Sequence, residues 1–299
     1  MNVYNGERFL EDALNSLLAQ THADWELIFW DSQSGDKSKE IFDRYSDSRF
    51  HYFCAPVKTT LGMARNNAIQ QAKGKWLAFL DQDDLWLPHK LEKQMEKIRT
   101  SASPEKTALV YGRTASFDVT GQEYDYSRPF DGKPLPEGNI FQALMKHGDF
   151  ICISSLLVRK DAFLEMGGIP EAYHFAEDYY LLAAIANRYD ACVLQKKCCR
   201  YRVHENSMTQ RLRMTSHLES LQILELWAKQ MEPGLYRERK KVYHTLIGWE
   251  KMSRERKYRE GLITIFKRGS WGYLLGRPWV KLMRLFKQTF CRRTHEDRD

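Results

Sequence analysis

Two aspartates, Asp81 and Asp83, are the residues whose type and spacing best suit chemistry. They follow the apolar run 76–80, so we expect them at the end of a buried strand. Carboxylates at this spacing can hold Mg²⁺ or Mn²⁺ against a diphosphate, because hard cations prefer oxygen ligands and neutralise phosphate charge. The simpler alternative is that residues 81–84 form a turn and cap the helix that Pro88 opens. The pair alone does not decide between these readings.

The elements that must position these aspartates follow an α/β pattern. Apolar residues at helical spacing alternate with short apolar runs through about the first 200 residues, which predicts a largely parallel sheet covered by helices. Ligands bind at the carboxyl ends of the strands in such a sheet. Because Asp31 also directly follows an apolar run, we expect it to share one cleft with Asp81 and Asp83. The expected helices are 6–20, 37–45, 61–72, 88–99 and 177–188, and the expected strands are 25–30, 49–53, 76–80, 107–117, 151–158 and 191–201.

The C-terminal part of the chain has a different character. From residue 212 onward the pattern is helical only, so we expect an α/β domain over 1–210 and a helical extension over 211–299. Residues 231–299 hold 18 Lys and Arg against 8 Asp and Glu, whereas the rest of the chain holds 28 against 31. From Pro278, apolar residues alternate with Lys and Arg at a spacing of three, which predicts a basic amphipathic helix.

This basic helix has two readings of equal weight. It can lie in an anionic membrane surface, which suits its charge better than nucleic acid does. It can instead pack Trp279, Phe286 and its other apolar residues on the catalytic domain, with its lysines in solvent.

Composition excludes several classes of protein. The chain is 43% hydrophobic over 299 residues, which allows a sizeable core and excludes a disordered protein. The mean hydropathy of −0.58 and the lack of a bilayer-length apolar run argue against an integral membrane protein. The six cysteines show no metal-ligand spacing, and the charged start of the sequence does not resemble a signal peptide. We therefore expect a cytoplasmic protein with reduced thiols, whose tail allows a peripheral position on the inner face of the membrane.

Four stretches of the sequence, 4–10, 25–36, 61–66 and 74–88, resemble the motifs of family 2 glycosyltransferases of the GT-A fold, in the family's order. The resemblance continues through Glu177-Asp178 and through Tyr201-Arg202-Val203-His204, so it covers about the first 210 residues. It implies an inverting, metal-dependent transferase that uses Mn²⁺ or Mg²⁺. The implied donor is a nucleotide-diphosphate sugar, with UDP favoured over dTDP and GDP. The implied acceptor is a hydroxyl of a glycan or a lipid-linked sugar, in polysaccharide or glycolipid biosynthesis.

The resemblance also assigns roles to residues on the donor side. Asp31 resembles the acid that accepts a hydrogen bond from the uracil ring, and its alternative is a turn residue at a strand end. Arg65 resembles a nucleotide contact, and its alternative is a solvated arginine. Asp81 would face the ribose or the metal, and Asp83 would ligate the metal directly. The expected nucleotide-sugar-binding residues are Tyr4, Asn5, Asp31, Arg65, Asp81 and Asp83.

Asp178 resembles the family's catalytic base. Transfer with inversion needs one carboxylate to take the proton of the acceptor hydroxyl. The alternative is that Asp178 only suits the positive end of the helix dipole, which would also lower its pKa and make it a base that depends on positioning. Glu177 is expected on the acceptor side. His204 resembles a histidine that joins the metal or the diphosphate, and its alternative is a surface histidine at a strand end.

The sequence departs from the family pattern in three places. The first, normally central, strand precedes the position of Asn2 in the family and is missing here, which indicates a misassigned start site or a truncated, weakly active chain. Ser32 and Gln33 stand where the family commonly has aspartate and glycine, which weakens the expected base and ribose contacts. The Gln-x-x-Arg-Trp motif of processive synthases is absent, so we expect transfer of a single sugar.

Two other functions compete with this reading. A sugar-phosphate nucleotidyltransferase also uses an α/β sheet and a metal, but its Gly-rich N-terminal phosphate loop is not found. A membrane-surface protein that binds nucleotide sugars without turnover is the non-enzymatic alternative. A donor-hydrolysis assay separates turnover from binding.

Overall fold

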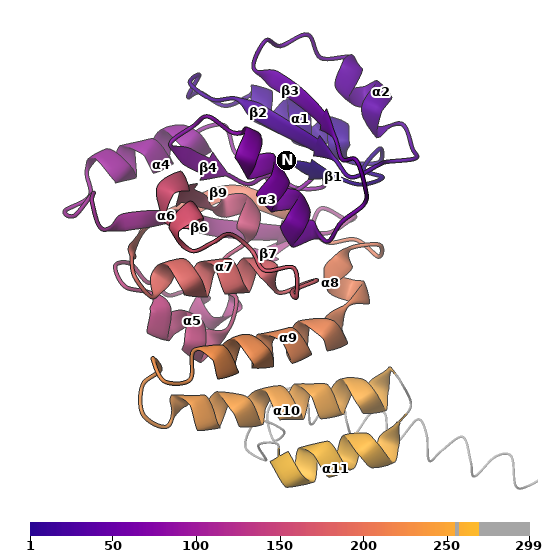
Figure 1. Ribbon diagram of the computed structural model, residues 1–299, viewed down its shortest axis with the longest axis vertical. Coiled ribbons are helices and arrows are strands. Elements are labelled where there is room, and N and C mark those ends of the chain that lie inside the picture. The colour runs from indigo at the N-terminus through magenta and orange to yellow at the C-terminus, as the bar shows by residue number, and fades with distance from the viewer. Residues whose placement is uncertain (255–256, 269–299) are drawn as a thin grey trace, which may run out of the picture. The chain divides into compact units, whose positions relative to one another are not determined.

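The computed structural model describes residues 1–254 and 257–268, and the chain divides into two compact units. The first unit is Met1–Leu212 and the second begins at Arg213 (Figure 1). Among the described residues, none of the helices combines the length and apolar character that crossing a bilayer requires.

A small parallel sheet forms the N-terminal part of the first unit. Its strands lie in the order β1, β2, β3, and every pair is parallel. All five residues of the central strand β2 are buried, as expected of a strand with helices on both faces. The elements of this part are β1 (Asn2–Val3), α1 (Leu10–Leu18), β2 (Leu27–Asp31), α2 (Ser38–Asp43), β3 (Phe50–Cys54) and α3 (Leu61–Gln71).

A mixed sheet of six strands forms the rest of the first unit. Its strands lie in the order β4, β8, β6, β9, β5, and β7 pairs with β6. Its strands are β4 (Trp76–Ala78), β5 (Leu85–Trp86), β6 (Thr107–Phe117), β7 (Glu123–Asp125), β8 (Leu157–Arg159) and β9 (Asp190–Arg202). Its helices are α4 (Lys90–Arg99), α5 (Phe141–His147), α6 (Lys160–Glu165), α7 (Glu177–Ala186) and α8 (Met208–Arg211), with short 3₁₀ turns η1 (Arg128–Phe130) and η2 (Ile153–Ser155).

The expectation of a largely parallel sheet is correct for the first sheet and wrong for the second. Only the β6–β9 pair runs parallel in the second sheet, and its other pairs are antiparallel. Antiparallel neighbours need no crossover helix, so strands that read as part of a βαβ series can reverse instead. The strand expected at 151–158 is mostly the turn η2, and only β8 at its end is extended.

The first strand is short rather than wholly missing. Asn2 and Val3 pair with Trp30 and Asp31 of β2, and the amine of Met1 donates a hydrogen bond to the Ile28 carbonyl at 2.9 Å. Ahead of Met1, the edge of β2 and the edge of β4 face a common cavity of about 540 Å³.

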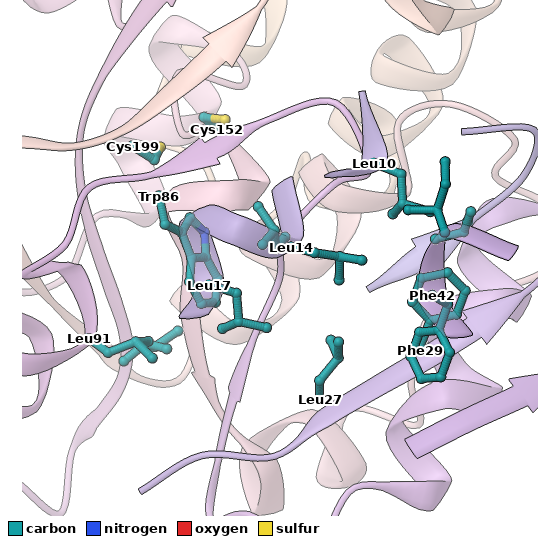
Figure 2. Packing of buried hydrophobic residues seen from close by; sticks show 14 of the residues in the cluster. Leu10, Leu14, Leu17, Leu27, Phe29, Phe42, Trp86, Leu91, Cys152 and Cys199 are labelled. Carbon is teal, nitrogen blue, oxygen red and sulfur yellow. The ribbon is translucent and has the colours of Figure 1, made fainter. Parts of the chain in front are cut away.

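Helix α1 forms the centre of the main core (Figure 2). Its residues Leu10, Leu14 and Leu17 recur at helical spacing and are all buried. They pack with Phe29 and Phe42 of the first sheet region, and the same cluster includes Trp86 of β5 and Leu91 of α4. Full burial of each such side chain contributes about 1.5–3 kcal/mol, so α1 joins the two sheets through one hydrophobic core.

The second unit is helical in its described residues, as predicted. It contains α9 (Arg213–Leu226), α10 (Leu235–Ser253) and α11 (Tyr258–Arg268). Met252 and Ile265 form a small core between α10 and α11. The basic amphipathic helix predicted from Pro278 lies outside the described residues.

Candidate active site

The acidic motif forms a tight turn after β4. The N–H of Asp84 donates to the Asp81 carbonyl at 3.2 Å, so the turn reading is correct as far as the backbone is concerned. The side chain of Asp83, however, contacts a distant part of the chain. Asp83 Oδ2 lies 2.9 Å from His204 Nε2, which comes from the segment after β9. The structure therefore brings Asp83 and His204 together, with 24% and 10% of their side-chain surfaces exposed, and their role as metal ligands stays a prediction.

The fourth residue of the motif, Asp84, connects the turn to the second sheet region through hydrogen bonds. It is fully buried, its Oδ2 accepts from Ser154 Oγ at 2.5 Å, and its Oδ1 accepts from the backbone N–H of Arg202 at 3.0 Å. Burial raises the pKa of Asp84 well above its usual value, and the charges of Asp83 and Asp81 raise it further. Sequence reasoning treated this residue only as part of a turn.

Arg202 is a second residue beside the acidic motif that the sequence did not single out. Its Nε donates to the Asp83 carbonyl at 2.9 Å, and its Nη2 pairs with Asp12 at 2.9 Å. The guanidinium also lies over the Phe9 ring, which packs against His204. Two residues of the segment 201–204 therefore hold the acidic turn: Arg202 binds its backbone at the Asp83 carbonyl, and His204 contacts the Asp83 side chain.

Arg65 lies at the centre of the buried charges. Its Nη2 is 3.1 Å from Asp81 Oδ1 and its Nη1 is 2.5 Å from Glu177 Oε1, and only 3% of its side chain is exposed. The prediction of a solvated arginine as the alternative is wrong, because the guanidinium is enclosed. A nucleotide contact by Arg65 stays a prediction, since the described partners of its guanidinium are carboxylates.

The approach of α3 to α7 makes this arrangement possible. A Cβ on Gly62 would lie 2.6 Å from Ile169 Cγ2, so a larger residue would displace this side chain of the segment before α7, whereas Glu177 Cβ at 3.4 Å would be in ordinary contact. The side chain of Thr60 caps the start of α3 by accepting from the Met63 N–H at 3.3 Å.

Glu177 and Asp178 begin α7 and carry perturbed pKa values. Burial raises the pKa of Glu177 to about 8, with the nearby Arg65 charge acting in the opposite direction. Its Oε2 has no hydrogen-bond partner among the described residues. Glu177 is only 2% exposed, and its predicted acceptor-side role stays a prediction.

Burial also raises the pKa of Asp178, while Arg65 and the Tyr179 N–H lower it. The expectation that the helix dipole would leave Asp178 with a lowered pKa is therefore wrong in direction. Desolvation disfavours the charged carboxylate more than the first turn of the helix favours it. A raised pKa makes Asp178 a stronger base at neutral pH than an exposed aspartate.

Asp31 lies at the end of β2 and is 3% exposed. Its Oδ1 accepts from the Ser34 N–H at 2.8 Å, and its Oδ2 accepts from the Tyr52 hydroxyl at 2.7 Å. It thus acts as a turn residue, yet each carboxylate oxygen can accept a second hydrogen bond, so a base contact remains compatible with this geometry.

The loop of Tyr4 and Asn5 lies between the Asp31 turn and the acidic motif. Asn5 Oδ1 accepts from the Gly35 N–H at 2.8 Å, and the Asn5 N–H donates to Ser34 Oγ at 3.0 Å. Tyr4 is 43% exposed, with the Lys58 ammonium 3.5 Å from its ring centroid. The structure therefore links the two predicted halves of the donor site through this loop.

The side chains that could ligate a metal here fit a divalent cation that is held mainly by a bound diphosphate. Asp83 and His204 offer one oxygen and one nitrogen ligand, and no group of three acidic, histidine or cysteine ligands is found among residues 1–254 and 257–268. Mg²⁺ commonly uses one or two protein carboxylates together with substrate phosphates, so two protein ligands are enough. His204 Nδ1 is buried without a hydrogen-bond partner in the described part of the chain.

The family follows from the sequence that builds this site. Residues 1–167 match the model of the family described as Glycosyl transferase family 2. These residues are more than half of the chain. The chain belongs to this family. The matched part of the glycosyltransferase includes Arg65 and the acidic motif, whereas Asp178 and His204 lie beyond it.

Curated relatives of the glycosyltransferase are bacterial. It is 29% identical over 212 residues to the Escherichia coli protein named UDP-Glc:alpha-D-GlcNAc-diphosphoundecaprenol beta-1,3-glucosyltransferase WfgD, with 70% of this chain and 78% of that protein covered. It is 31% identical over 165 residues to a Bacillus subtilis protein named for teichuronic acid biosynthesis as the glycosyltransferase TuaG, with 52% and 60% covered. The chain thus spans less than two thirds of the Bacillus protein.

Two solved structures are similar to the glycosyltransferase in fold. Staphylococcus aureus TarS 1-349 in complex with UDP-GlcNAc has a TM-score of 0.60 at 17% identity, with 86% of this chain and 72% of that chain covered. The mannosyltransferase PcManGT from Pyrobaculum calidifontis, in complex with GDP-Man and Mn²⁺, has a TM-score of 0.60 at 14% identity, with 100% and 86% covered. The predicted GT-A fold is confirmed.

Proposed function

We propose that this glycosyltransferase moves a single sugar, with inversion, from a nucleotide-diphosphate sugar to an acceptor hydroxyl. The observation that carries the proposal is the position of Arg65, which joins Asp81 of the acidic motif to Glu177, the neighbour of Asp178. Through these contacts, the residues proposed for the donor and the proposed base belong to one charge network. A protein that only bound nucleotides would not need a buried carboxylate with a raised pKa beside that network.

The chemistry needs one displacement. Asp178 accepts the proton of the acceptor hydroxyl, and the oxygen attacks the anomeric carbon of the donor sugar. The new glycosidic bond forms as the bond from that carbon to the diphosphate breaks, and the diphosphate leaves with the bonding electrons. One attack from the opposite side inverts the anomeric configuration, so a second carboxylate is not required.

Asp83 and His204 would hold a divalent cation at the diphosphate. When bound, Mn²⁺ or Mg²⁺ supplies positive charge that stabilises the departing nucleotide diphosphate. The buried Arg65 adds a fixed positive charge near Asp81, so the acids around the donor do not simply repel an anionic substrate.

UDP is the favoured nucleotide in our proposal, and the acceptor is a glycan or lipid-linked sugar of a cell-surface polymer. The support is the names of the relatives, which refer to a UDP-Glc donor with a diphosphoundecaprenol acceptor and to teichuronic acid. A position at the inner face of the membrane, reached through the basic tail, belongs to the same proposal.

The test is a donor screen on the full chain with UDP-Glc, UDP-GlcNAc and GDP-Man, each with Mn²⁺, Mg²⁺ or EDTA. We expect metal-dependent release of one nucleoside diphosphate, increased by a lipid-linked acceptor. Binding without release would support the non-enzymatic alternative. Pyrophosphate-dependent formation of a nucleoside triphosphate would support the nucleotidyltransferase.

A further inference from the structure

The middle residue of the acidic motif, Gln82, makes a reciprocal contact with the Tyr4 backbone. Gln82 Oε1 accepts from the Tyr4 N–H at 2.9 Å, and Gln82 Nε2 donates to the Tyr4 carbonyl at 3.3 Å. One side-chain amide therefore replaces the two hydrogen bonds that a neighbouring strand would supply. This contact joins the metal motif directly to the loop that follows β1.

The loop has a conformation that needs support. Asn5 has a positive φ of 51°, which is uncommon outside glycine. A Cβ on Gly6 would lie 2.7 Å from Gln82 Oε1, so the next residue must be small for the amide to reach Tyr4. On the opposite side the loop is fixed by Ser34 and by Ser38, whose Oγ accepts from the Gly6 N–H at 2.9 Å.

The side chains of Tyr4 and Lys58 at this loop are suited to bind a nucleotide. Tyr4 keeps 43% of its surface exposed, and Lys58 lies 3.5 Å from the ring centroid. An aromatic base can stack on an exposed tyrosine ring, and a nearby ammonium can meet an anionic phosphate. Asp83, the proposed metal ligand, is the residue directly after Gln82.

We propose that Gln82 is a positioning residue for nucleoside diphosphate binding. It holds the Tyr4–Lys58 pair at a fixed place relative to Asp83, so that the base and the metal-bound diphosphate are recognised together. This inference rests on the proposed function, because it needs a nucleotide in the cleft.

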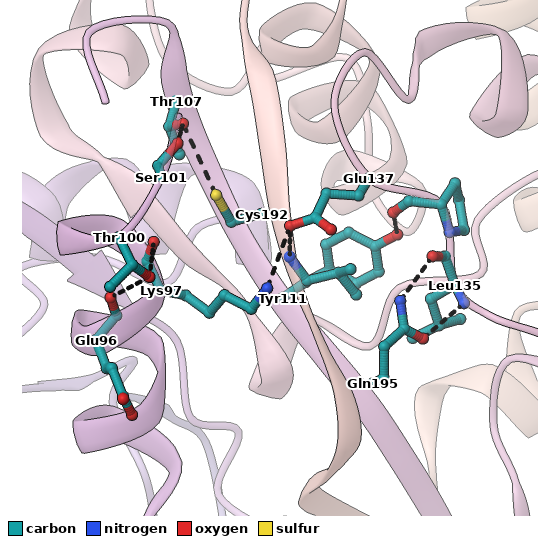
Figure 3. Close-up of polar contacts among 12 residues, drawn as sticks. Glu96, Lys97, Thr100, Ser101, Thr107, Tyr111, Leu135, Glu137, Cys192 and Gln195 are labelled. Carbon is teal, nitrogen blue, oxygen red and sulfur yellow. Dashed lines mark hydrogen bonds and ion pairs between the residues drawn. The ribbon is translucent and has the colours of Figure 1, made fainter. Parts of the chain in front are cut away.

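The structure offers a matched control for removing this contact. Gln195 makes the same reciprocal contact with Leu135, accepting from its N–H at 2.9 Å and donating to its carbonyl at 3.0 Å (Figure 3). Neither Gln195 nor Leu135 is among the candidate site residues. Methionine is similar to glutamine in size but removes both hydrogen bonds, so Gln82→Met and Gln195→Met lose the same number of contacts.

The experiment measures UDP affinity by calorimetry, with and without Mn²⁺, and the donor KM and kcat of the same proteins. We expect Gln82→Met to weaken UDP binding and raise the donor KM by about tenfold, the effect of roughly one or two hydrogen bonds, with kcat at saturation nearly unchanged. The loss should also occur without Mn²⁺, since it concerns the base. Gln195→Met should bind UDP as the wild type does.

A second variant tests the contact from the other side. Gly6→Ala places a Cβ against Gln82 Oε1 and should weaken UDP binding in the wild type, but add little in a Gln82→Ala background, which lacks the atoms that this Cβ would meet. Wild-type affinity and KM in Gln82→Met would overturn the inference and leave the proposed function standing. A wild-type chain that binds no nucleoside diphosphate would overturn both. If Gln82→Met and Gln195→Met lost UDP affinity equally, the contact would be general loop support and the inference would be wrong.

Discussion

Asp83 Oδ2 and His204 Nε2 lie 2.9 Å apart, although 121 positions separate them in the chain. Arg202 secures this approach, because its backbone donates to Asp84 and its side chain donates to the Asp83 carbonyl. A turn that served only to start a helix would not need these contacts from a distant strand. These contacts support our proposal that the pair is a ligand site.

We predict that Asp83→Asn abolishes the Mn²⁺-dependent part of UDP binding, because a hard cation loses its charged oxygen ligand. Calorimetry with and without Mn²⁺ measures this part directly. The control is Asp118→Asn, since Asp118 is also a turn aspartate, whose Oδ1 accepts from the Thr120 N–H at 2.8 Å. Equal affinity of both variants for UDP and Mn²⁺ would mean that Asp83 is only a turn residue.

Asp178→Asn should separate binding from chemistry. We expect turnover to fall by at least about a hundredfold, the usual scale for loss of a general base, with UDP affinity close to that of the wild type. Asp161→Asn is the matched control, because Asp161 accepts from the next backbone N–H in the first turn of α6 as Asp178 does in α7. Similar losses in both variants would assign Asp178 to helix capping.

Asp178 should also make kcat depend on pH. Because burial raises the pKa of Asp178, kcat should fall as the pH drops through a value above the ordinary aspartate pKa of about 3.9. Arg65 opposes this shift, so Arg65→Met should move the acidic limb of the kcat profile to higher pH. An unchanged limb in that variant would show that Asp178 does not control it.

The sequence predicted the α/β pattern well because β2 and the first half of β6 carry apolar runs, whose signal is local. Through the family resemblance it also assigned Asp83 and His204 to one metal site, and the structure brings these two residues together. It did not find Asp84, Arg202 or Gln82 as parts of the site, because their roles arise from backbone contacts with segments far away in the chain. Periodicity does not encode such contacts. The direction of the Asp178 pKa shift was missed for a related reason, since desolvation depends on the packing around it.

Glu177 should make folding stability fall with rising pH. Its pKa in the folded chain is about 8, above the value of 4.5 for an unperturbed glutamate, so the folded state holds the proton more tightly. The resulting stability is fully present below about pH 4.5 and is lost as the pH rises through about 8. Glu177→Gln should therefore flatten the fall in melting temperature between pH 5 and pH 8. An identical slope in the wild type and the variant would contradict this.

The basic tail, residues 278–299, should bind anionic membranes. Its sequence combines Trp279 and Phe286 with a basic stripe, so apolar insertion and charge attraction should act together. We expect the full chain to co-sediment with anionic vesicles, less so at high salt, and deletion of 278–299 to reduce binding without lowering the melting temperature. Earlier melting of the truncated chain, with no vesicle binding by the intact one, would make the tail a structural brace.

The cavity between β2 and β4 should accept an added strand. Leu27 and Phe29 belong to the core cluster of α1, and Ile28 and Trp30 to that of α3, so helices cover both faces of the sheet here. A strand that continues β1 ahead of Met1 would be buried on both faces and should be apolar throughout. The Met1 nitrogen already donates a hydrogen bond to the Ile28 carbonyl, as a residue of a paired strand would.

We therefore predict that joining four apolar β-branched residues ahead of Met1 raises the melting temperature by several degrees. Burial of each side chain stabilises the folded state by about 1.5–3 kcal/mol, whereas ordering each residue costs about 1.5 kcal/mol. Because these two terms nearly cancel, we expect a modest net stabilisation to which the hydrogen bonds of the strand contribute. The control is a Gly/Ser extension of equal length, which can pair but buries little apolar surface. Calorimetric melting of the three proteins checks the prediction, and equal melting temperatures for both extensions would show that the cavity does not accept a strand.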